Sequence, residues 1–157
     1  MVKGSTATWI ERLLTLFVIA LVLAIADQYV KLRLPTPMWA LHHRSDTWFI
    51  GSCALLLAVA PLTRVPSNSV TASAGVFSGG VLGNLISAGA NGFVVPNPLI
   101  IGTRDGIAFN LADTFVLAGN LMLMASLIVV TIRYRDHLGR KALERALRRT
   151  IRRRAEA

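Results

Sequence analysis

Residues 114–132 read TFVLAGNLMLMASLIVVTI, a run of 19 residues without Asp, Glu, Lys or Arg. A helix that crosses the hydrocarbon core of a bilayer needs about 20 consecutive, mostly apolar residues. Three further uncharged runs precede this one: 14 residues at 13–26, 17 at 47–63 and 39 at 65–103. The pattern predicts an all-α membrane protein built as a four-helix bundle. We expect the helices at 9–30, 47–62, 70–89 and 110–133.

The composition agrees with a membrane protein. The chain has 157 residues, of which 54% are hydrophobic and only 16% are charged, whereas a soluble domain carries about 25% charged residues. This excludes a soluble enzyme and a DNA-binding module. We expect residues 1–133 to form the transmembrane domain, with a small extracytoplasmic cap region. Residues 134–157 then form a basic cytoplasmic tail, which we expect to be a helix from Leu138 onward. A cleavable signal peptide ending at Ala24-Ile25-Ala26 is the less favoured interpretation of the first run.

The cations predict the orientation, because cytoplasmic loops carry an excess of Lys and Arg. With both termini inside, thirteen cations lie in the cytoplasm and four outside, and ten of the thirteen belong to the segment 133–157. We therefore predict an N-in, C-in protein of the bacterial inner membrane. Apolar Leu143, Leu147 and Ile151 recur at helical spacing within the tail. The tail either lies on anionic lipid or is a solvated topology anchor. No nucleic-acid motif accompanies the charge, so we expect no nucleic-acid partner.

The third predicted helix is rich in glycine. Gly75, Gly79 and Gly83 recur every four residues and so share one face. Small residues let helix backbones approach closely in lipid, where little hydrophobic drive holds helices together. We favour packing inside one bundle over a dimer contact for this face.

Four polar residues stand at membrane depth, where they are costly and usually functional or paired. They are Asp27, Asn84, Asn110 and Asp113, and the proposed topology puts all four at the outer leaflet. Asn110 and Asp113 are three apart and share a helix face. An N-cap and first-turn role is an equally weighted interpretation for that pair. Lys31, one turn after Asp27, is a candidate partner for its carboxylate.

His42 and His43 with Asp46 invite comparison with a metal site. Adjacent histidines point in different directions, and the usual i,i+4 spacing is missing. We favour loop residues at headgroup level, beside Trp39 and Trp48 of an aromatic belt. We expect no metal and no cofactor.

Three blocks resemble signal peptidase II, the lipoprotein signal peptidase. Residues 27–31 (DQYVK) are similar to its D-Q-x-x-K motif, 79–84 (GGVLGN) to G-G-x-x-G-N, and 109–113 (FNLAD) to F-N-x-A-D. The resemblance implies a four-helix aspartyl peptidase of bacterial inner membranes, which cuts the signal peptide from lipidated prolipoproteins. It also implies that Asp113 matches one of the family's two catalytic aspartates.

The chain departs from that family at decisive places. Pro96 stands where the resemblance implies the other catalytic aspartate, and Ser87-Ala88 replace an Asp-Arg pair. The family's N-x-G-A-A-F-like cradle pattern is missing around residues 41–46. Asp105 is the remaining candidate for a second acid, between Gly102 and Gly106.

Two functions follow from these matches and departures. We favour a non-catalytic relative that binds a transmembrane helix or lipid of a partner protein as an accessory subunit. The alternative is an active lipoprotein signal peptidase that uses Asp113 with Asp105 on a lipoprotein precursor. Aspartyl hydrolysis needs two carboxylates, one as base and one as acid, and a lone Asp113 supplies one.

Overall fold

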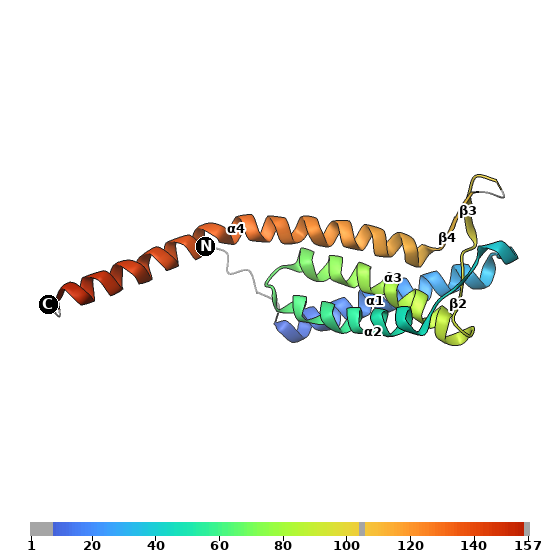
Figure 1. The fold of residues 1–157 in the computed structure, drawn as a ribbon, viewed down its shortest axis with the longest axis horizontal. Helices are drawn as coiled ribbons and strands as arrows, with labels where there is room; N and C mark the ends of the chain where they lie inside the picture. Colours follow the sequence, from blue (N-terminus) through green and yellow to red (C-terminus); the bar gives the residue numbers. More distant parts are fainter. Residues whose placement is uncertain (1–7, 104–105, 156–157) are drawn as a thin grey trace.

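A computed structural model describes residues 8–103 and 106–155 (Figure 1). Four of its helices are long and apolar enough to cross a membrane, which confirms the predicted fold class. The spanning elements are α1 (Trp9–Arg33), α2 (Asp46–Val59) continued by the 3-10 helix η2 (Ala60–Arg64), α3 (Asn68–Ala90) and α4 (Leu111–Ala155).

The helix ends follow local capping chemistry. Thr8 and Glu11 form a capping box that starts α1, because each side chain accepts a hydrogen bond from the other's backbone N–H. Ser67 accepts from the backbone of Val70, so α3 begins two residues earlier than predicted. At its other end, α1 continues three residues past Val30, because the chain stays helical until just before the prolines.

Helix α3 is the centre of the bundle. In its most apolar window 67% of the residues are buried, against 22% in α1, 11% in α2 and 6% in α4. The glycine face predicted from the sequence lies inside the molecule. A Cβ atom at Gly75 would stand 2.9 Å from Ile19 of α1, and one at Gly79 would stand 2.8 Å from Leu23. The glycines therefore let α1 and α3 pack backbone against backbone.

Helix α4 runs without a break through 45 residues (Figure 1). The predicted boundary at residue 133 falls inside this helix, so the basic tail is its continuation and extends past the bundle. The physical reason is that 133–155 holds no proline. A single glycine inside a helix costs only about 1 kcal/mol.

Two short antiparallel sheets form the cap region at the end of the bundle. Strand β1 (Leu41–His43) follows the 3-10 helix η1 (Met38–Ala40) and pairs with β2 (Val94–Pro96), with Leu41 opposite Pro96. Strand β3 (Leu99–Ile101) pairs with β4 (Ile107–Phe109). A strand therefore forms at 41–43 although the cradle pattern is absent from the sequence. The two sheets bring β2 and the start of α4 together over the C-terminal half of α3.

Candidate functional site

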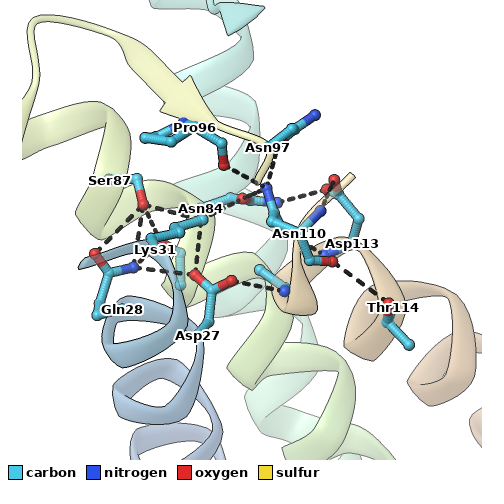
Figure 2. Close-up of polar contacts among 12 residues, drawn as sticks. Asp27, Gln28, Lys31, Asn84, Ser87, Pro96, Asn97, Asn110, Asp113 and Thr114 are labelled. Carbon is cyan, nitrogen blue, oxygen red and sulfur yellow. Dashed lines mark hydrogen bonds and ion pairs between the residues drawn. The ribbon is translucent and has the colours of Figure 1, made fainter. Parts of the chain in front are cut away.

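Asn110 and Asp113 form a reciprocal cap at the start of α4. The Asn110 Oδ1 atom accepts a hydrogen bond of 2.9 Å from the Asp113 backbone N–H, and the Asp113 Oδ2 atom accepts one of 3.3 Å from the Asn110 N–H. Both side chains also contact other elements, as Figure 2 shows. The cap and the polar site, weighed as alternatives in the sequence, are therefore present together.

Asn84 of α3 joins this cap to the rest of the site. Its Nδ2 atom donates to the Asp113 Oδ1 atom at 2.9 Å. Its Oδ1 atom accepts from Asn110 Nδ2 at 3.0 Å and from Lys31 Nζ at 3.1 Å. One amide side chain thus connects α1, α3 and α4 (Figure 2).

Asp27 is fully buried on the α1 side of the site. Its Oδ2 atom makes an ion pair of 2.7 Å with Lys31 Nζ, and its Oδ1 atom accepts from the backbone N–H of Ala112 at 2.9 Å. Gly83 makes room for it, since a Cβ there would stand 2.8 Å from the same Oδ2 atom. The carboxylate is therefore neutralised by a neighbouring cation and held by a helix N-terminus.

Three members of the network were not assigned a site role from the sequence. Gln28 Nε2 donates to the carbonyl of Gly83 at 2.7 Å, and Ser87 Oγ accepts from Lys31 Nζ at 2.9 Å. Asn97 Oδ1 accepts from Asn110 Nδ2 at 2.6 Å. Gln28 could have been identified from the sequence, because it lies inside the 27–31 block. Ser87 could have been identified from its spacing, because it follows Asn84 by one helical turn. No sequence feature pointed to Asn97.

Pro96 contributes only its backbone to the site. Its carbonyl oxygen accepts from Asn110 Nδ2 at 3.3 Å (Figure 2). Asp105 lies outside the described residues. A cavity, described next, adjoins the network. Within the part of the chain that the structure describes, Asp113 is the acid that lines this cavity. The group at position 96 is a proline carbonyl bonded to Asn110.

That cavity lies between α2, α3 and α4 and has a volume of about 210 Å³. Asn84 and Asp113 line it, and so do Arg44 and Trp48. The Arg44 guanidinium carbon is 5.0 Å from the centroid of the Trp48 ring. The remaining lining residues are Ser52, Leu55, Phe77, Val81 and Val116.

Within residues 8–103 and 106–155, the histidines of the cap region do not gather acidic or sulfur ligands. His42 Nδ1 lies 3.3 Å from Asn97 Nδ2. Among the described residues, no group of three or more His, Cys, Asp or Glu side chains could hold a metal ion. His42 belongs instead to the edge of the polar network.

Two solved structures of bacterial membrane enzymes, determined by the in meso method, are similar to this chain. The one at 2.3 Å resolution has a TM-score of 0.55 and 20% identity, and covers 74% of this chain and 89% of its own. The one at 1.9 Å has a TM-score of 0.53 and 20% identity, and covers 72% and 92%. No family model and no curated protein matches the sequence. The likeness shows a fold shared with bacterial membrane enzymes.

Proposed function

We propose that this chain is a non-catalytic membrane protein with a signal-peptidase-II-like site, which binds a transmembrane helix or lipid of a partner as an accessory subunit. One observation carries the proposal. At position 96 the site offers a proline carbonyl, hydrogen-bonded to Asn110, and no carboxylate stands there to share a proton with Asp113.

The chemistry of aspartyl hydrolysis explains why this matters. One carboxylate must take a proton from water while a second donates to the carbonyl oxygen. Asp27 does not supply the second group, because Lys31 and the Ala112 amide already bind its two oxygens. Asp113 can accept or donate a proton, but it cannot do both in the same step.

The bundle surface supports a binding role. Helices α2 and α4 are mostly unburied within the chain, and a cavity lined by both apolar and polar side chains lies between them and α3, beside Asp113. Without strong hydrophobic drive in lipid, such a surface associates through close packing and polar contacts. A transmembrane helix or lipid of a partner meets both conditions.

The alternative proposal is an active lipoprotein signal peptidase that uses Asp113 with Asp105. The position of Asp113 on the cavity wall favours it, as does the fold shared with bacterial membrane enzymes. Asp105 would have to reach the site from the loop between β3 and β4.

The deciding experiment incubates purified protein with a lipidated prolipoprotein and follows cleavage by gel shift. An active lipoprotein signal peptidase serves as the positive control. We expect no cleavage by the parent chain. Cleavage that disappears in both Asp113→Asn and Asp105→Asn would overturn the proposal and establish the alternative. Cleavage lost only in Asp113→Asn would also overturn it, and would make Asp27 the next acid to test.

Two further measurements sharpen the result. Pro96→Asp places an acid at the position where this chain differs from the signal peptidase II pattern. Newly gained cleavage would show that this one residue accounts for the missing activity. Affinity purification of the tagged chain from membranes tests the accessory role, which predicts a stoichiometric membrane partner.

A further inference from the structure

Arg44 lines the cavity and brings to it a positive group in which one donor atom is unpaired. It lies between β1 and α2, and its guanidinium is held over the Trp48 ring. Its Nε atom is buried and has no hydrogen-bond partner within the described part of the chain. A buried donor without an acceptor is unfavourable, and guanidinium geometry matches carboxylate or phosphate oxygens.

Asp113 brings a negative group to the same cavity. It accepts hydrogen bonds from two neutral donors, the Asn84 amide and the Asn110 backbone. Lys31, the nearby cation, makes its ion pair with Asp27 instead. An ionised carboxylate offers about four acceptor positions on its two oxygens, so Asp113 retains capacity for a cationic donor.

We infer that this cavity binds the headgroup of a zwitterionic aminophospholipid, with the phosphate at Arg44 and the primary ammonium at Asp113. A ligand with one negative and one positive group complements both charged side chains of the cavity. A purely anionic headgroup would satisfy Arg44 but leave Asp113 without a cationic partner from the ligand.

The size and lining of the cavity agree with a lipid. Its 210 Å³ is below the range of about 300–1,000 Å³ that is typical of pockets for drug-sized ligands. It is too small for a whole phospholipid, so the acyl chains of a bound lipid must lie outside it. Leu55 provides the exit, because it lines the cavity and is 43% exposed on the outer face of the bundle. Phe77, Val81 and Val116 complete an apolar wall.

This inference rests on the proposed function, since it assigns the ligand class of a binding cavity. The two can nevertheless fail separately. Cleavage of a prolipoprotein by the parent would overturn the proposed function without changing a measured headgroup preference. A parent chain without a headgroup preference would overturn the inference. It would not change the proposed function, which the cleavage assay tests.

The test measures lipid retention by the purified full-length chain with native mass spectrometry. Phosphatidylethanolamine, phosphatidylcholine and phosphatidylglycerol with identical acyl chains are compared. Charge-assisted hydrogen bonds predict a preference for phosphatidylethanolamine of roughly tenfold over the other two lipids. Phosphatidylcholine carries the same phosphate, but its quaternary ammonium cannot donate to Asp113.

Variants then assign each charge to its wall. Arg44→Gln should weaken retention of phosphatidylethanolamine and phosphatidylglycerol alike. Asp113→Asn should remove the preference, so that phosphatidylethanolamine and phosphatidylglycerol are retained equally. Arg33→Gln is the matched control, because Arg33 also lies over an aromatic ring, 5.2 Å from the Tyr29 centroid, but lines no part of this cavity.

The outcomes are decisive even where a variant folds poorly. The ratio of phosphatidylethanolamine to phosphatidylglycerol retained by one preparation does not depend on the fraction of the protein that is folded. A parent chain that does not distinguish the three headgroups would overturn the inference. Retention unchanged by Arg44→Gln, or lowered equally by Arg33→Gln, would overturn it as well.

Discussion

The contact between α1 and α3 makes a quantitative prediction at Gly79. Replacing this glycine with alanine would place a Cβ atom 2.8 Å from the Leu23 Cβ and 3.1 Å from the carbonyl oxygen of Ala20. Neither neighbour is the free end of a flexible side chain. The two helices must therefore move apart to accept the methyl group.

The size of the effect follows from a comparison with Gly51. Both glycines lie inside helices, so alanine gains about 1 kcal/mol of helix propensity at either position. At Gly51 the new Cβ has no heavy atom within 4 Å outside its own helix, so only that gain remains. At Gly79 overpacking opposes the gain with a cost of about 1–3 kcal/mol. We expect Gly79→Ala to be about 1–3 kcal/mol less stable than Gly51→Ala.

The assay is reversible unfolding in mixed micelles titrated with a denaturing detergent, followed by circular dichroism. The difference between the two variants removes the common effect of the detergent on the parent. Equal free energies of unfolding would refute the reasoning, because they would mean that the glycine face of α3 does not hold α1 at this distance. We expect the larger side chain of Gly79→Leu to push α1 and α3 apart and to damage assembly more than Gly79→Ala does. If the two variants damage assembly equally, the reasoning is refuted as well.

Three further predictions concern the network, the tail and the topology. Asn84→Leu should lower the free energy of unfolding by about 1–3 kcal/mol in the same assay, because it removes the hydrogen bonds that Asn84 makes to three side chains and leaves Asp113 Oδ1 without the Asn84 donor; a change below 0.5 kcal/mol would contradict the proposed linking role. Deleting 138–157 should leave the bundle folded and abolish salt-sensitive binding to anionic vesicles, and binding that persists unchanged would assign the tail to topology alone. In a Cys53→Ser background, single cysteines that replace Arg44 or Arg104 should react only from outside. Single cysteines that replace Arg64 or Arg153 should react only from the cytoplasm. Labelling of position 104 only from the cytoplasm would contradict the orientation.

The four spans could be predicted because each needs only an uncharged run of sufficient length. Helix ends were less accessible, since they depend on caps such as Ser67 and on how far α1 continues before its prolines. The continuity of α4 was missed for a different reason. A change from apolar to basic composition near Arg133 marks a change of solvent, and a helical backbone passes through it without a break.

Part of the site could also be predicted, because depth in the membrane selects polar residues that need partners. The structure brings Asp27, Lys31, Asn84 and Asp113 into one network; their functional roles remain predictions. Asn97 could not be found in this way. It reaches Asn110 because β2 pairs with β1 and carries the chain across the end of α3, a long-range arrangement that no local spacing encodes.

An aspartate at position 113 does not by itself imply catalysis, because the folded network also requires one. Its Oδ1 atom accepts from Asn84 and its Oδ2 atom accepts from the Asn110 backbone, so both oxygens must be acceptors. Asparagine would turn one acceptor into a donor that faces another N–H group. Interhelical hydrogen bonds in membranes contribute only about 0.6 kcal/mol each on average, yet a mismatched buried group costs about 1–3 kcal/mol. The network therefore enforces its residue types through the penalty for mismatch, and this penalty acts whether or not any peptide is cut.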